Sequence, residues 1–252
     1  MVRPGHGAVA NATMMRNNAA ASEYTYIPVY THTNIRSTFM KVVAILSQKG
    51  GVGKTTLATC LAVAAEADGR ATAVLDLDPQ ATASFWGDVR EAETPAVSSL
   101  QAVRLGPVIA AARKAGTDLV IIDGAAVARD VAFQAAQQAD LVLIPTKAAV
   151  FDTMSMTHTL DLVRQLAKPS AVVLTFVSPK GQETADAISA IEQLGAEVCP
   201  ATIGNRKAFF RAQSMGQAAQ EYEPRGAAAA EVARLYTYTC NRLYGESKEP
   251  TP

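Results

Sequence analysis

A glycine-rich stretch between an apolar segment and a helical segment constrains this chain more than any other feature of its sequence. It follows the apolar run 42–46 and precedes the helical pattern 57–67. Its residues are Lys49, Gly50, Gly51, Val52, Gly53, Lys54, Thr55 and Thr56. Glycines allow several backbone N–H groups, and the positive end of the following helix dipole, to face one anion. A strand, a glycine-rich turn and a helix N-terminus in this order therefore predict a phosphate-binding loop.

Two side chains are expected to complete this loop. Lys54 is predicted to place a positive charge on the β- and γ-phosphates of a nucleotide, and the Thr55 hydroxyl to ligate Mg²⁺. The general form of the pattern has glycine where this chain has Gln48, and this chain has a second lysine, Lys49, at the start of the loop. The alternative is a glycine-rich turn with two solvated lysines, but the context and the spacing both favour a phosphate loop.

The second lysine makes the loop similar to the deviant Walker A motif of the ParA/MinD family of ATPases. In that family the early lysine reaches the phosphates of the partner subunit in a nucleotide-sandwiched dimer. The resemblance therefore implies that the chain binds ATP and Mg²⁺, forms a homodimer, and uses Lys49 in trans. Assembly beyond the dimer is left open.

A second acidic motif follows the apolar segment 71–75. It reads Asp76-Leu77-Asp78-Pro79-Gln80, and carboxylates at the carboxyl end of a parallel strand lie where α/β sheets bind ligands. The alternative is a polar loop with Asp-Pro turn chemistry. The motif resembles the second signature of the ParA/MinD family, and the resemblance implies that Asp76 supports Mg²⁺ and that Asp78 orients the attacking water.

A third acidic position ends the apolar run 118–123. The pattern resembles a Walker B motif, which implies that Asp123 holds Mg²⁺ through a bound water. The following residues 124–126 are Gly-Ala-Ala rather than the proline-containing continuation of many family members. This form, and the aromatic pair Phe85-Trp86, resemble those of the small ParF-like partition ATPases. Packing is the default interpretation of Trp86, the single tryptophan.

Apolar segments alternate with helical patterns along the rest of the chain. Strands are expected at 139–145, 171–177 and 198–203, and helices at 107–114, 131–138, 153–167, 182–194, 206–214 and 227–244. This alternation predicts an α/β fold with a doubly wound, mostly parallel sheet flanked by helices. We expect a single ATPase domain over 40–245, a disordered extension over 1–39 and a polar tail over 246–252.

Composition limits the possible partners. A hydrophobic content of 49% with 18% charged residues indicates a soluble globular protein, and no apolar run approaches the ~20 residues of a membrane span. The formal net charge is zero, so any contact with nucleic acid must come from a local patch. Three cysteines, Cys60, Cys199 and Cys240, lie far apart without metal-ligand spacing and are expected to be small buried side chains. This spacing disfavours a shared iron–sulfur cluster.

One segment is a candidate DNA contact. No acidic residue lies between Glu197 and Glu221, yet Arg206, Lys207 and Arg211 do. Lys207 and Arg211 share a helix face by their i, i+4 spacing. The resemblance implies sequence-independent DNA binding near this position in the ATP-bound dimer, for which phosphate contacts suffice. An ordinary solvated helix face is the alternative.

The C-terminal helix separates two functional hypotheses. MinD-type relatives end in a basic amphipathic helix that binds membrane, whereas 227–244 carries only two cations, Arg234 and Arg242, and is expected to pack on the domain. The first hypothesis is therefore a cytoplasmic, nucleoid-associated DNA-partition ATPase without a membrane partner. Its slow hydrolysis would be stimulated by a ParB-like or ParG-like centromere-binding protein on a plasmid or chromosome. The alternative is a MinD-like or scaffold-positioning ATPase that places a protein complex.

Overall fold

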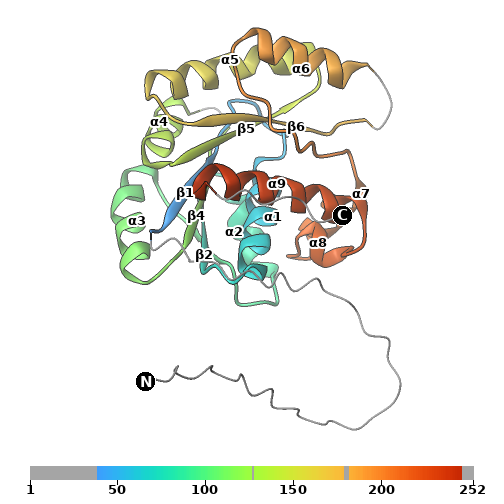
Figure 1. Cartoon of the computed structure of the whole chain (residues 1–252). Helices are drawn as coiled ribbons and strands as arrows, with labels where there is room; N and C mark the ends of the chain where they lie inside the picture. The colour runs from blue at the N-terminus through green and yellow to red at the C-terminus, as the bar shows by residue number, and fades with distance from the viewer. Residues whose placement is uncertain (1–38, 127, 179–181, 246–252) are drawn as a thin grey trace, which may run out of the picture. The chain divides into compact units, whose positions relative to one another are not determined.

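The computed structural model of the chain describes residues 39–126, 128–178 and 182–245 (Figure 1). Apart from Phe39, the extension expected over 1–39 lies outside these residues, and so does the tail expected over 246–252.

A single parallel sheet organises the fold. Its six strands lie in the order β3-β2-β4-β1-β5-β6, and every neighbouring pair is parallel. The strands are β1 (Lys41–Ile45), β2 (Thr72–Asp76), β3 (Ala96–Ser99), β4 (Leu119–Asp123), β5 (Leu141–Lys147) and β6 (Ser170–Thr175). The chain leaves the central β1 toward one edge and later returns to build the other edge. The doubly wound parallel sheet is thereby confirmed, and it forms its ligand crevice where the carboxyl ends of the central strands meet.

Helices cover both faces of the sheet (Figure 1). They are α1 (Lys54–Ala67), α2 (Thr82–Val89), α3 (Leu105–Lys114), α4 (Arg129–Gln138), α5 (Val150–Gln165), α6 (Glu183–Gln193), α7 (Lys207–Ser214), α8 (Ala219–Tyr222) and α9 (Ala227–Tyr244), with a 3₁₀ turn η1 (Ala102–Arg104). Alternate strand residues face opposite sides: Val43 and Ile45 pack with α1, α2 and α7–α9, whereas Val42 and Ala44 pack with α3–α6. Burial on both faces explains why the central strands are continuous apolar runs.

The structure differs from the sequence-based expectation in several places; the short helices η1 and α8, for example, were not expected. Residues 198–203 do not form a strand and make only isolated bridges, Val172 with Val198 and Val177 with Gly204. The edge strand β3 was missed because three of its four residues are exposed, so no buried pattern marks it. The helix α2 was missed because its N-cap is Ala81, which offers no capping side chain.

The C-terminal helix α9 packs on the domain, as expected. The Arg70 guanidinium donates to the Tyr236 hydroxyl at 3.2 Å and lies 4.2 Å from the centre of the Tyr244 ring, while the Tyr236 hydroxyl donates to Asp68 at 2.9 Å. These contacts join α9 to the residues that follow α1. None of the helices in the described ranges is long and apolar enough to cross a membrane.

The three cysteines are buried and free, as expected of small apolar side chains. Burial raises the pKa of the Cys60 and Cys199 thiols to about 12. Both therefore stay protonated and unreactive at neutral pH. In the part of the chain that the structure describes, no group of three or more His, Cys, Asp or Glu side chains is placed to hold a metal ion by itself.

Candidate nucleotide-binding site

The glycine-rich loop connects the carboxyl end of β1 to the N-terminus of α1. Gly51 has a φ of 69° and Gly53 a φ of 90°, in the left-handed region that glycine adopts without steric cost. Gly53 is the N-cap of α1, and no side chain caps this helix. The first N–H groups of α1 and its positive dipole end are therefore available to an anion in the loop.

Lys54, the first residue of α1, is only 7% exposed. Its ammonium donates to the Lys49 carbonyl at 3.4 Å, so it lies across the inside of the loop. Burial lowers the pKa of Lys54, and the charges of Asp123 and Asp78 oppose this shift. An incoming phosphate would remove the electrostatic cost of this buried cation.

Thr55, at the start of α1, contacts Asp123, at the end of β4. The Thr55 hydroxyl donates to Asp123 Oδ2 at 2.6 Å, whereas Asp123 Oδ1 is buried and has no hydrogen-bond partner. Burial raises the pKa of Asp123 to about 7, and the hydrogen bond from Thr55 opposes that rise. A hydroxyl beside an unsatisfied buried carboxylate oxygen is a donor set that Mg²⁺ prefers, so these residues fit the metal that the loop implies.

The two aspartates after β2 lie in different environments. Asp76 is fully buried, and its two oxygens accept hydrogen bonds from the N–H groups of Asp78 and Ser84, both at 3.0 Å. Asp78 is partly exposed and accepts from the Gln80 N–H at 3.0 Å. Asp76 therefore orders the loop and the start of α2, and Asp78 is the carboxylate of this pair that solvent can reach.

Gly124 lies directly after Asp123 and close to β1, the strand that precedes the glycine-rich loop. Its N–H donates to the Ile45 carbonyl at 3.1 Å. A Cβ at this position would lie 2.5 Å from Leu46 Cδ2 and 3.0 Å from the Ile45 carbonyl oxygen. The absence of a side chain is what allows β1 and the end of β4 to approach each other beside the site.

We expect Gly124→Ala to lower the free energy of unfolding by about 1–3 kcal/mol, because the added methyl group must displace Leu46 or the backbone. Gly106→Ala is the matched control, since a Cβ at Gly106, within α3, meets nothing within 4 Å. Urea unfolding of both variants measures the difference. Equal stability of the two variants would contradict the close approach at Gly124.

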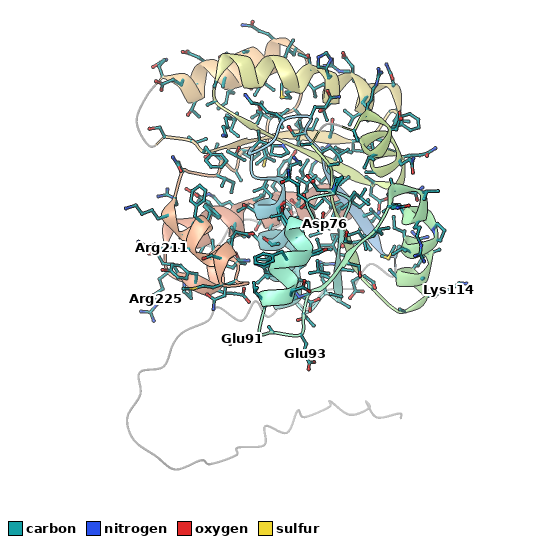
Figure 2. The ribbon with its side chains drawn as sticks, turned by 180° about the vertical axis from the view of Figure 1, so that it is seen from behind. Asp76, Glu91, Glu93, Lys114, Arg211 and Arg225 are labelled. Carbon is teal, nitrogen blue, oxygen red and sulfur yellow. The ribbon has the colours of Figure 1, made fainter. Side chains whose placement is uncertain are left out.

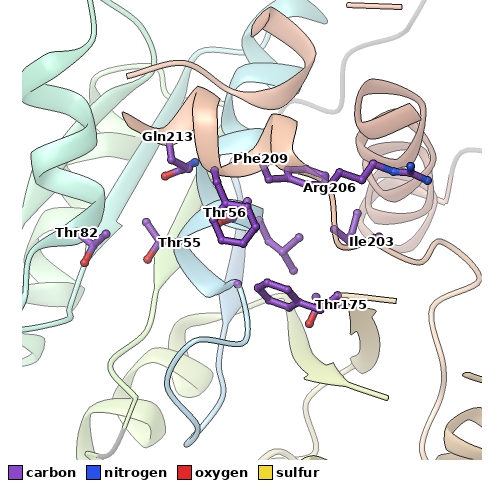
Figure 3. A pocket seen from close by; sticks show the side chains of 13 residues that line it. Thr55, Thr56, Thr82, Thr175, Ile203, Arg206, Phe209 and Gln213 are labelled. Carbon is purple, nitrogen blue, oxygen red and sulfur yellow. The ribbon is translucent and has the colours of Figure 1, made fainter. Parts of the chain in front are cut away.

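A cavity of about 250 Å³ opens beside the loop (Figure 3). Thr55 and Thr56 line it at the start of α1, and Thr82 of α2 and Gln213 of α7 lie near Thr55. The remaining lining residues are Gly53, Leu57, Thr175, Phe176, Ile203, Gly204, Arg206, Phe209 and Phe210. The cavity is thus a mainly apolar, aromatic space that continues directly from the phosphate loop.

Phe176 in this cavity was not identified from the sequence. It follows β6 with a φ of 54°, a conformation that a bulky residue rarely adopts outside functional sites. Its ring centre lies 6.1 Å from that of Phe210 and 4.5 Å from the Lys147 ammonium. No local pattern marks this position, because the conformation depends on what packs around the end of β6.

The basic residues near α7 differ in their surroundings. Arg206 is ion-paired with the buried Glu231: its Nε and Nη2 lie 2.8 and 2.6 Å from Glu231 Oε1. Figure 3 shows its guanidinium pointing away from the cavity that its side chain lines. Lys207 and Arg211 are exposed on α7, and no ion pair of either is found among the described residues. The structure therefore places these three side chains near one another but leaves only two of them with unbalanced charge.

A glycine-rich loop after the central strand of a parallel sheet, with a buried lysine inside it and a hydroxyl–aspartate pair beside it, defines a P-loop nucleotide-binding protein. Residues 43–219 match the family model described as the CobQ/CobB/MinD/ParA nucleotide binding domain. The chain belongs to this family and is an ATPase of the ParA/MinD type that uses ATP and Mg²⁺.

Several relatives support this placement. The chain is 33% identical over 204 residues to the maintenance of carboxysome distribution protein A of Gloeobacter kilaueensis, covering 78% of this chain and 91% of that protein. It is 29% identical over 182 residues to the protein ParA of Rhizobium radiobacter, covering 68% of this chain and 81% of ParA.

Solved structures match the fold. The septum site-determining protein MinD of Pyrococcus horikoshii, in complex with Mg-ADP, matches with a TM-score of 0.69 at 17% identity, covering 84% of this chain and all of MinD. A variant of McdA from Cyanothece in complex with ATP matches with a TM-score of 0.64 at 18% identity, covering 84% of this chain and 99% of McdA.

Proposed function

We propose that this ATPase is a dimerising switch that binds DNA without sequence preference in its ATP state and releases it after slow hydrolysis. The observation that carries this proposal is Lys49 at the start of the loop. A small-molecule kinase or synthetase needs Lys54 and Thr55 but has no use for a second lysine. A lysine that serves the neighbouring subunit makes catalysis depend on dimerisation, which is what a switch requires.

The residues of the site divide the work of ATP hydrolysis. The loop N–H groups and Lys54 bind the phosphates, and the aromatic cavity beside Thr56 accommodates the base. Mg²⁺ neutralises charge on the phosphoryl group when it is bound. Thr55 and Asp123 would hold this ion, and Asp76 would support its shell while it orders the Asp78 loop. Asp78 orients the attacking water, because it is the acidic side chain of this loop that solvent reaches.

DNA is proposed to bind at α7. Lys207 and Arg211 carry the unbalanced charge, while Arg206 contributes a partly exposed guanidinium and fixes the start of the helix through Glu231. Closure of two subunits around ATP would bring two such patches together and double the local charge. Such binding needs phosphate contacts only and would place the protein on the nucleoid. The cargo is proposed to be a plasmid or chromosome carrying a ParB-like or ParG-like centromere-binding partner that stimulates hydrolysis.

Binding to duplex DNA of arbitrary sequence, measured with ATP and with ADP across a salt series, tests this function. We expect binding in ATP alone, weakening steeply with salt. Lys207→Gln/Arg211→Gln is expected to weaken this binding at least tenfold. The control is Arg113→Gln/Lys114→Gln, which makes the same change of charge in the last turn of α3, away from α7 (Figure 2). Absence of binding in both nucleotide states would overturn the DNA proposal. Equal loss in both variants would contradict the assignment to α7.

Positioning of a protein body is a second candidate, and one observation favours it. The relative that is 33% identical carries the name maintenance of carboxysome distribution protein A. A large protein assembly with its own adaptor protein would then replace the plasmid as cargo. Deletion of the gene distinguishes the two: loss of a plasmid or chromosome supports partition, and misplaced protein bodies with normal DNA inheritance support this second candidate.

A further inference from the structure

Arg90, directly after α2, is held more firmly than any role assigned above requires. Its side chain is only 6% exposed. The two terminal nitrogens donate to the two carboxylate oxygens of Glu221 at 2.8 and 2.7 Å, and Nη1 also donates to the Gly216 carbonyl at 2.9 Å. Nε donates to the Thr94 carbonyl at 2.7 Å. A bidentate, buried guanidinium of this kind fixes distance and orientation together.

Two further contacts join the same elements. The buried Trp86 of α2 donates from its indole nitrogen to the Gln217 carbonyl at 3.0 Å, and the Arg90 guanidinium lies 4.9 Å from its ring. Gly216 has a φ of 64°, and a Cβ there would lie 2.6 Å from the backbone nitrogen and Cα of Arg90. The end of α2 and the turn between α7 and α8 are therefore in backbone contact, with no room between them.

The other end of α2 is fixed to the nucleotide site. Asp76 accepts the Ser84 N–H with one oxygen and the Asp78 N–H with the other. The helix between these two attachments is eight residues long, or about 12 Å. Figure 2 shows it running from the side of Asp76 toward the side of Glu91. A short, regular helix with hydrogen bonds at both ends transmits displacement rather than absorbing it.

The turn between α7 and α8, which contacts the end of α2, belongs to a pair of helices that packs on α1, the helix after the phosphate loop. Gln213 of α7 donates to the Thr59 hydroxyl at 2.7 Å, and Gln220 of α8 donates to the Cys60 carbonyl at 2.7 Å. The α7–α8 unit, residues 207–222, thus contacts α1 through side chains and α2 through the Arg90 guanidinium and backbone. A shift of α2 relative to α1 must change one of these two attachments.

We propose that Arg90 is a positioning residue for ATP hydrolysis that couples the Asp78 loop to the α7–α8 unit. Arg90 fixes the position of α2, and α2 in turn fixes the position of the Asp78 loop. A rearrangement of the Asp78 loop between the ATP and ADP states therefore moves the α7–α8 unit. The coupling is reciprocal, so a ligand on α7 changes the geometry at Asp78. That this ligand is DNA rests on the proposed function above; the coupling itself does not.

Arg90→Lys tests the proposal, because lysine keeps the charge and loses the bidentate geometry. Amide hydrogen exchange of residues 207–222 is compared between ADP and a non-hydrolysable ATP analogue. We expect the wild type to show a nucleotide-dependent difference that Arg90→Lys reduces at least threefold, with kcat about three- to tenfold lower and KM for ATP within about twofold. Arg113→Lys, an exposed position in α3, is the matched control and is expected to behave as the wild type.

Glu221→Gln provides the second variant, since it removes the acceptor charge and leaves Arg90 in place; thermal unfolding of each variant confirms a folded protein. A wild type without a nucleotide-dependent difference in 207–222 overturns the coupling. So does a full difference retained in both variants, or a loss confined to KM. A wild type that shows the difference but binds no DNA supports the coupling and overturns the DNA function, so the two failures are distinguishable.

Discussion

Replacement of Asp78 by alanine is expected to slow ATP hydrolysis at least about 100-fold while leaving ATP affinity within about threefold. Asp78 is the partly exposed carboxylate of its loop, and its proposed task is to orient water rather than to hold the nucleotide. Phosphate affinity comes from the loop N–H groups and the Lys54 ammonium, all of which remain in the variant. Single-turnover hydrolysis and equilibrium binding of ATP, measured on the same preparation, separate the two effects.

The matched control for this substitution is Asp88→Ala, which removes an exposed carboxylate from α2, away from the loop. It is expected to hydrolyse ATP at the wild-type rate. A decrease of less than tenfold for Asp78→Ala, or a loss of affinity as large as the loss of rate, would contradict the role proposed for Asp78.

Asp76 should behave differently from Asp78, although the two lie in one short motif. Both Asp76 oxygens accept backbone N–H groups, and the residue is fully buried. Its removal would leave two partly buried N–H donors without their acceptor and would release the start of α2, so stability and activity fall together. The environment of each carboxylate, rather than the spacing of the motif, thus separates a structural task from a chemical one.

The sheet and the phosphate loop could be predicted from sequence because both depend on local patterns. The continuous apolar runs that became β1, β2, β4, β5 and β6 reflect burial on both faces, and the loop needs glycine at fixed positions to reach a positive φ. The helix 227–244 has the expected bounds because its apolar face repeats regularly and Gly245 ends it.

What could not be predicted depends on contacts between distant segments. The start of α2 is stabilised by Asp76, eight residues upstream of Ser84, and not by a residue at the N-cap. The ion pair of Arg206 with Glu231 of α9 is another example, because no acidic residue lies near Arg206 in the sequence. Sequence spacing alone cannot show such pairs, because folding brings the partners together.

Lys49→Ala is expected to reduce hydrolysis by about 1000-fold, and mixing it with Asp78→Ala is expected to restore activity to about a quarter of the wild-type rate. If Lys49 serves the neighbouring subunit, a mixed dimer contains one site with its own Asp78 and a partner's Lys49. Random exchange of subunits makes half of the dimers mixed, and half of their sites are complete. If Lys49 instead serves its own nucleotide, no site in any dimer has both groups, and the mixture stays inactive.

The control replaces Asp78→Ala in the mixture with Lys49→Ala/Asp78→Ala, in which neither subunit supplies the loop lysine. Restored activity in the first mixture and none in the control can arise only from a lysine acting across a dimer. The result would therefore establish that the protein forms a dimer and that Lys49 acts on the nucleotide of the partner subunit. An inactive first mixture, with subunit exchange verified by differently labelled chains, would mean that Lys49 acts within its own subunit. The ATPase would then need no partner to complete its site, and the switch proposed here would lose its physical basis.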